Sequence, residues 1–146
     1  MRPPSDRTVT FTVMGVAGKA RHRTVSRGGR TWSYTPKTTT DMEAAVRAAF
    51  RAICAEQPHD GPVSLKVEAM MEMPASWGPK KKMKMRGRCA MKKPDADNIL
   101  KLIGDSLNTV AWRDDSQVSS SHITKRHGDE SKSVVTITFH SVDAER

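Results

Sequence analysis

The sequence predicts an α+β domain (mixed α/β) of two layers, in which one small mixed sheet is packed with helices. Three observations predict it. Segments with a period of two alternate with segments of helical period, glycines and prolines separate them, and the chain has 146 residues, about the size of one domain. We expect residues 1–146 to form this single domain in the order strand, helix, strand, helix, strand, strand.

The N-terminal part contains a strand, a loop and a helix. Residues 8–14 (TVTFTVM) alternate and are rich in β-branched side chains, which indicates a strand. Residues 15–36 hold four glycines and many polar residues, so we expect a long, mobile, basic loop. Thr40 or Asp41 can cap a helix that runs to about Glu56. The apolar face of this helix comprises Met42, Ala45, Val46, Ala49, Phe50 and Ile53.

A second strand and a basic segment follow. Residues 63–73 (VSLKVEAMMEM) alternate again, and Pro74 ends that strand. The basic segment, at about residues 76–93, has no clear amphipathic face. It predicts a loop with at most one short helical turn near residues 81–85.

The C-terminal part contains a helix and two strands. A helix is expected from about residue 96 to 110. Residues 117–125 and 133–139 are expected to be a closing pair of strands joined by the turn HGDES.

The charge of the chain favours a polyanionic partner. Lys and Arg total 25 against 16 Asp and Glu, for a net charge of +9. Residues 18–37 carry six basic residues and no acid, and residues 76–93 carry eight and no acid. One such run is commonly a solvated loop, but two runs flanking an acidic cluster favour nucleic acid. The residues expected to contact DNA phosphates are Lys19, Arg21, Arg23, Arg27, Arg30, Lys80, Lys81, Lys82, Lys84, Arg86, Arg88 and Lys93.

Other features exclude several classes of protein. No apolar run approaches 18 residues, and the N-terminal residues lack the apolar stretch of a signal peptide, so we expect a cytoplasmic protein without membrane contact. Cys54 and Cys89 are too few for a disulfide framework and have no histidine at metal-finger spacing, so free thiols are expected.

An acidic cluster interrupts the basic chain between residues 93 and 118, which hold five aspartates. In the helix expected there, Asp97, Lys101, Asp105 and Asn108 share the face opposite the apolar side chains. Alternating charges at this spacing also occur on ordinary solvated helices.

Two further acids lie at the ends of this helix. Asp95 follows Pro94, so it either caps the helix beside Asp97 or points with Asp97 to one side of an extended chain. Asp115 follows the helix C-terminus, where acids oppose the helix dipole and stability would not select them. If the next strand turns back along the helix, Asp115 approaches Asp95 and Asp97.

Three converging carboxylates need a cation or protons. Two unit charges about 4 Å apart repel by roughly 4 kcal/mol at an effective dielectric of 20. A hard ion such as Mg²⁺ or Mn²⁺ prefers such oxygen ligands, joins them to phosphate and activates water. Lys101 could then hold the phosphate, stabilise the leaving oxygen or tune the acids.

The runs KPDADNILKLIGDSLN and WRDDSQV together resemble the signature of the RusA family of Holliday-junction resolvases, common in prophage-borne enzymes. FTVMGVAGKARHR, YTPKTTTDMEAAVR and MPASWGPKKK resemble earlier parts of that family less sharply, so the resemblance covers about residues 8–140. A departure is Thr109, where many relatives have glycine.

The resemblance implies a homodimeric, Mg²⁺-dependent endonuclease of DNA recombination and repair, with Mn²⁺ as a possible substitute. It would nick two strands of a four-way junction symmetrically and leave 5′-phosphate and 3′-hydroxyl ends. The family's catalytic acids and metal ligands fall on Asp95, Asp97 and Asp115, and its important lysine falls on Lys101. Two alternatives stay open: a DNA-binding module with a structural cation and no cleavage, and a nuclease for other branched DNA.

Overall fold

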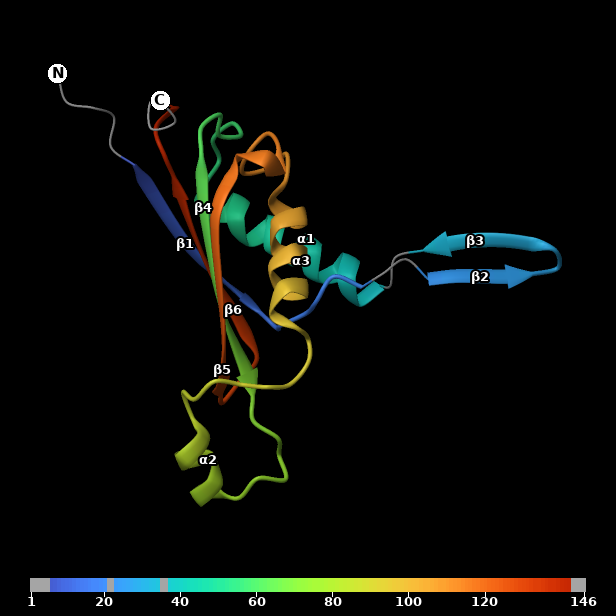
Figure 1. Ribbon diagram of the computed structural model, residues 1–146, viewed down its shortest axis with the longest axis vertical. Helices are drawn as coiled ribbons and strands as arrows, with labels where there is room; N and C mark the ends of the chain where they lie inside the picture. The colour runs from blue at the N-terminus through green and yellow to red at the C-terminus, as the bar shows by residue number, and fades with distance from the viewer. Residues whose placement is uncertain (1–5, 21–22, 35–36, 143–146) are drawn as a thin grey trace.

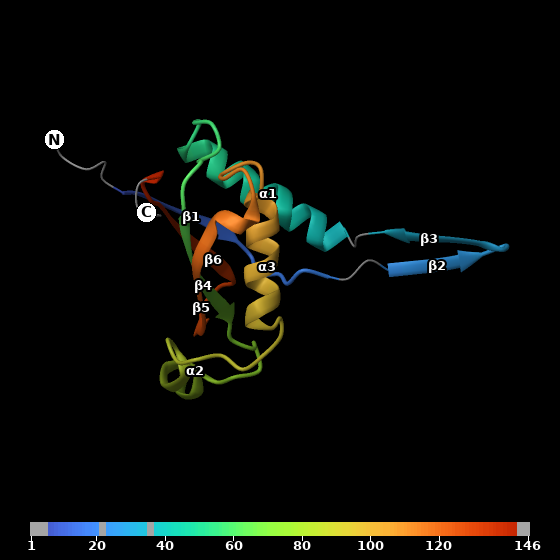
Figure 2. The same ribbon diagram turned by 45° about the horizontal axis from the view of Figure 1, so that its top comes forward.

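A four-stranded mixed sheet with helices on one face forms the centre of the protein (Figures 1 and 2). This computed structural model describes residues 6–20, 23–34 and 37–142. The sheet has the order β1-β6-β4-β5, and β6 is antiparallel to both neighbours while β5 is parallel to β4. This two-layer arrangement confirms the predicted α+β class. The strands are β1 (Arg7–Met14), β4 (Val63–Glu72), β5 (Val118–Gly128) and β6 (Lys132–Phe139).

The core lies between the sheet and two helices, α1 (Lys37–Ile53) and α3 (Ala96–Leu107). Every second residue of β4 is buried, from Val63 to Met71, because successive strand side chains point to opposite faces. The helices contribute one apolar stripe each. On α3 the buried stripe is Ile99, Leu102, Ile103 and Leu107, and on α1 it is Met42, Val46 and Phe50.

The prediction that the last two strands pair with each other is wrong. Both strands exist, but β4 lies between β5 and β6, and each of them pairs with β4. β6 buries every second residue and lies inside the sheet, whereas most of β5 is exposed or half-buried at the edge. Because β5 is parallel to β4, the chain between them must cross over. That crossover contains α2 (Pro79–Met85) and α3, and it places α3 beside β5.

The prediction of a loop at residues 15–36 is wrong for the second half of that range, which contains a β-hairpin. The hairpin consists of β2 (Arg23–Arg27) and β3 (Arg30–Tyr34), and it lies apart from the sheet in both views (Figures 1 and 2). Gly28 and Gly29 form its turn with φ of 59° and 76°, values that glycine adopts without a Cβ clash. Two adjacent glycines between β-branched segments favour this turn.

Helix boundaries differ from the expected ones by a few residues. α1 begins at Lys37, so Thr40 is not its cap; the Thr40 hydroxyl donates to the Lys37 carbonyl instead. α3 ends at Leu107 because Thr109 has a φ of 68°, outside the helical region. The predicted short helical turn in the basic segment is present as α2.

The structure also bears on the predictions about the cysteines and about membrane-spanning segments. Cys54 and Cys89 are free, as expected. In the part of the chain that the structure describes, no helix is long and apolar enough to cross a membrane.

Candidate active site

Helix α3 and strand β5 enclose a groove that gathers most of the predicted catalytic residues. Its volume is about 260 Å³, and Asp97, Lys101, Asp105 and Asp115 line it. The first three share one stripe of α3 at steps of four residues, opposite the buried stripe. Asp115 comes from the other side, because the chain after α3 turns back into β5. The apolar residues lining the groove are Leu65, Leu100 and Val118.

Asp95 occupies a different position. It is the N-cap residue of α3, with extended backbone and no capping bond from its side chain, and its side chain is exposed. It lies two residues before Asp97 but does not line the groove. Within residues 6–20, 23–34 and 37–142, no three His, Cys, Asp or Glu side chains are grouped closely enough to hold one metal ion. Convergence of Asp95, Asp97 and Asp115 on a single ion therefore stays a prediction.

A buried tryptophan fixes the orientation of Asp115. Trp112 is 0% exposed, and its indole Nε1 donates a 3.0 Å hydrogen bond to Asp115 Oδ1. The ring is locked by the core, so the carboxylate that it binds has a defined direction. The spacing from Trp112 to Asp115 thus has a structural reason.

Asp114, the other acid of WRDD, supports the backbone. Its side chain accepts a 2.9 Å bond from the Ser116 amide. Hydrogen bonding by the Ser116 side chain, and then by this amide, holds the pKa of Asp114 below its usual value. Gln117 completes a capping box of the short helical turn Asp115–Gln117 by accepting from the Asp114 amide. The sequence left the role of Asp114 open, and the structure assigns it a cap.

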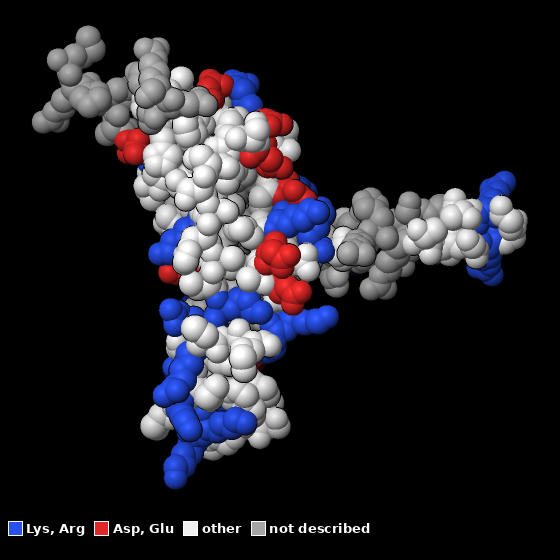
Figure 3. Space-filling view, viewed as in Figure 1, with Lys and Arg blue, Asp and Glu red and all other residues white. Residues whose placement is uncertain are grey.

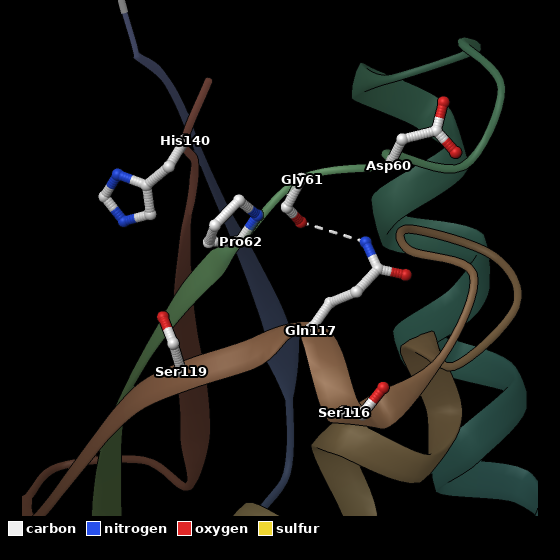
Figure 4. Close-up of a pocket in the computed structure, with 7 residues that line it drawn as sticks. All are labelled: Asp60, Gly61, Pro62, Ser116, Gln117, Ser119 and His140. Carbon is white, nitrogen blue, oxygen red and sulfur yellow. Dashed lines mark hydrogen bonds between the residues drawn. The ribbon is translucent and has the colours of Figure 1, made fainter. Parts of the chain in front are cut away.

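Gln117 also ties this turn to the chain before β4. Its Nε2 donates to the carbonyl oxygens of His59 and Gly61 at 2.7 and 2.9 Å. The second of these bonds crosses a separate pocket of about 490 Å³ (Figure 4). None of the predicted site residues lines that pocket, so Gln117 acts there as a brace for the loop that carries Asp115.

An ion-pair network beside the groove was not foreseen from the sequence. Lys19 Nζ lies 3.3 Å from Glu43 Oε2 and 3.4 Å from Asp105 Oδ2. Lys19 follows β1, Glu43 is on α1 and Asp105 is on α3, so local patterns give no sign of this contact.

The basic segment forms a surface next to the acidic groove. Acidic side chains gather over α3, and basic side chains cover the α2 region below and the tip of the β2–β3 hairpin (Figure 3). No residue of α2 is buried, so its lysines are accessible. Arg86 makes a two-pronged bond to Asp129, and Lys81 Nζ lies 4.5 Å from the centre of the Trp77 ring. Lys80, Lys81, Lys84, Arg86, Arg88 and Lys93 are exposed, Lys82 is half-buried, and Arg21 lies outside the described residues.

Comparison with known proteins decides the family. A family model described as "Endodeoxyribonuclease RusA" matches residues 14–138. The chain belongs to the RusA family. Over 134 residues it is also 30% identical to the uncharacterized protein YqaN of Bacillus subtilis (strain 168), with 88% of this chain and 94% of YqaN covered.

As a RusA-family endodeoxyribonuclease, the chain is an endonuclease whose family acts on Holliday junctions, a form of branched DNA. The matched residues include the acidic groove, the hairpin and the basic segment. The RusA-like motif occupies residues 93–118, from the segment before α3 to the start of β5.

Proposed function

We propose that this RusA-family protein resolves Holliday junctions in DNA recombination and repair by divalent-metal-dependent paired nicking, with Mg²⁺ as its ion. The observation that carries the proposal is the groove in which Asp97 and Asp115, from opposite sides, meet Lys101. Carboxylates beside DNA are repulsive unless a cation joins them to phosphate. A groove of this kind in a chain of net charge +9 supports a hydrolytic centre more than a plain binding surface.

The donor set of the groove fits a hard divalent ion. Mg²⁺ is commonly bound by one or two carboxylates, with waters and substrate phosphates completing its shell. Asp97 and Asp115 would be its protein ligands, and Asp95 stands at the entrance of the same helix, within one turn of Asp97. When bound, the ion would supply Lewis-acid activation of the phosphodiester and of water.

The remaining chemistry belongs to side chains of the chain. Among the described residues, Lys101 makes no ion pair, so its ammonium group can face the scissile phosphate and stabilise negative charge on it. Trp112 holds the Asp115 carboxylate in place. The lysines of α2 bind the phosphate backbone and set the register of the DNA without reading its bases.

The β2–β3 hairpin is a second DNA contact in this proposal. A two-stranded hairpin is only marginally stable alone in water, so one that lies apart from the core gains from a partner. Arg27 and Arg30 flank its turn and are exposed, which suits a phosphate backbone.

A cleavage assay tests the proposal. A labelled four-way junction, a flap and a linear duplex are each incubated with Mg²⁺, with Mn²⁺ and with EDTA. Metal-dependent cutting of the junction alone supports the proposal, and equal cutting of the flap would instead support a general branched-DNA nuclease. Tight binding without any product would support a DNA-binding module with a structural cation.

Paired nicking and its ends need a second substrate. On a supercoiled plasmid with an extruded cruciform, two nicks in one encounter give linear DNA, whereas a single nick relaxes the plasmid and removes the cruciform. Products with 5′-phosphate and 3′-hydroxyl ends are sealed by DNA ligase without further treatment. We also propose the homodimer that the family resemblance implies. Sedimentation at working concentration tests it, and a monomer that still gives linear product would contradict it.

Two variants test the assigned roles. Asp97→Asn should abolish cleavage and leave junction binding intact or stronger, because a repulsive charge is removed. Lys101→Ala should slow cleavage while the metal still binds. Glu68→Gln is the matched control, because Glu68 is an exposed acid on β4 outside the groove. Loss of binding together with activity in Asp97→Asn would make that aspartate structural.

A further inference from the structure

Lys19 is held against the acidic helix by its backbone. Its amide donates to the Asn98 carbonyl at 2.9 Å, which fixes Lys19 beside the first turn of α3. The residue before it, Gly18, packs so closely that an added Cβ would lie 2.9 Å from Pro94 Cβ and 3.1 Å from Asn98 Cβ. The position of Lys19 is therefore set by packing.

The side chain of Lys19 is committed to two carboxylates. Its ammonium lies between Glu43 and Asp105 at 3.3 and 3.4 Å. The side chains of Lys19, Glu43 and Asp105 are only 23%, 14% and 33% exposed, so these charges are poorly solvated and depend on each other. A phosphate contact by Lys19 would leave both acids without their cation.

Asp105 shares the groove with the two proposed metal ligands. Asp97, Asp105 and Asp115 all line it, although no three acids of the described residues are grouped closely enough to hold one ion, so at most two of the three can be its ligands together. Of these, Asp105 has a lysine ion pair, and Asp115 has the Trp112 indole. Among the described residues Asp97 has no ion pair. The three acids are thus distinguished by what holds them.

We infer that Lys19 is a positioning residue, which holds Asp105 away from the divalent ion and so leaves Asp97 and Asp115 to bind it. The inference rests on the proposed metal-dependent function. It replaces the DNA contact that the basic run around Lys19 suggested. Lys101 and Lys19 then have different tasks: Lys101, within the stripe of α3, faces the phosphate, and Lys19, which contacts the stripe at Asp105, neutralises acids.

The test measures Mn²⁺ affinity by electron paramagnetic resonance of the free protein, without DNA. Lys19→Met should bind Mn²⁺ about fivefold more tightly, because it frees the Asp105 carboxylate and removes a nearby positive charge. Asp105→Asn alone should stay within about twofold of wild type, since Asp105 is not a ligand. The double variant should return to within about twofold of wild type.

Cleavage and DNA binding supply the second readout. Lys19→Met should slow cleavage of preformed junction complexes by about tenfold or more, because the ion is displaced toward Asp105. Its junction affinity and the salt dependence of that affinity should not change. Lys19→Arg keeps the charge and should restore most of the rate. Lys66→Met is the matched control, since Lys66 is a lysine on β4 that pairs with the exposed Glu68.

Clear outcomes overturn the inference. If Lys19→Met leaves Mn²⁺ affinity unchanged and lowers the log–log salt slope of junction binding by about 0.9, Lys19 is a phosphate contact. If Asp105→Asn weakens Mn²⁺ binding tenfold, Asp105 is a ligand, and this result holds even if Lys19→Met does not fold. If the wild-type protein binds no Mn²⁺ and cuts no junction, the proposed function itself fails and the inference falls with it.

Discussion

The turn after α3 contains a strained residue whose replacement should stabilise the protein. Thr109 has a φ of 68°, in the left-handed region, where a β-branched side chain is costly. This conformation costs a residue with a Cβ about 1–2 kcal/mol. Glycine removes that strain but adds about 0.5–1 kcal/mol of conformational entropy to the unfolded chain. Thr109→Gly should therefore raise the free energy of unfolding by about 0.5–1 kcal/mol.

The measurement is urea unfolding, with Thr109→Ala as the control that keeps the Cβ. The Gly variant should have a higher midpoint at unchanged slope, and its thermal midpoint should rise by about 1–4 °C. The Ala variant should stay close to wild type, because Thr109 is exposed and its hydroxyl makes no hydrogen bond with a described residue. A Gly variant less stable than Ala would show that the Thr109 side chain contributes more than its backbone strain costs.

Three further predictions concern the residues around the groove. Trp112→Phe removes the bond to Asp115, so cleavage should fall by about 10- to 100-fold with unchanged junction binding; an unchanged rate would mean that this bond does not orient Asp115. Asp114 has a depressed folded-state pKa, so its stabilising effect is present above its unfolded pKa and lost as pH falls through the folded one. The stability difference between wild type and Asp114→Asn in melts should therefore shrink below about pH 4, and a constant difference would contradict this cap. Replacing Lys80, Lys82 and Lys84 of α2 by glutamine should lower the log–log salt slope of junction binding by about 2.7. An unchanged slope would show that these lysines do not contact phosphates.

Most of the helices and strands could be predicted from the periodicity of apolar residues in the sequence. The amphipathic stripe of α3 and the alternation of β1, β4 and β6 follow from spacing alone, because each element must bury one face. The strand that pairs with β5 could not be predicted from this periodicity. An alternating pattern says which face is buried but not which strand is adjacent, and the short turn after Gly128 favoured a hairpin that β4 interrupts.

The residues of the candidate site also fall into those that local spacing predicts and those that it does not. Asp97 and Lys101 were predicted because they share a helix stripe, and the structure places Asp115 across the groove from them. The WRDD motif, by contrast, contains one acid in the groove and one acid that caps a turn, and residue type cannot distinguish these roles. Lys19 looked like any lysine of a basic run because its partners come from distant parts of the chain.

The separation of charges over one face gives the proposed reaction its physical logic. Basic side chains over α2 attract the DNA backbone, while the acids over α3 repel it (Figure 3). A DNA backbone that runs from the basic side chains of α2 toward the groove is repelled by the acids of α3 unless a divalent ion neutralises them. Productive binding in this proposal therefore requires the ion at the point of cleavage. The proposal assigns each lysine a role from its surroundings. The lysines of α2, none of which is buried, would hold phosphates. Lys19, which is paired with Glu43 and Asp105, would position an acid, and Lys101, which makes no ion pair among the described residues, would face the substrate.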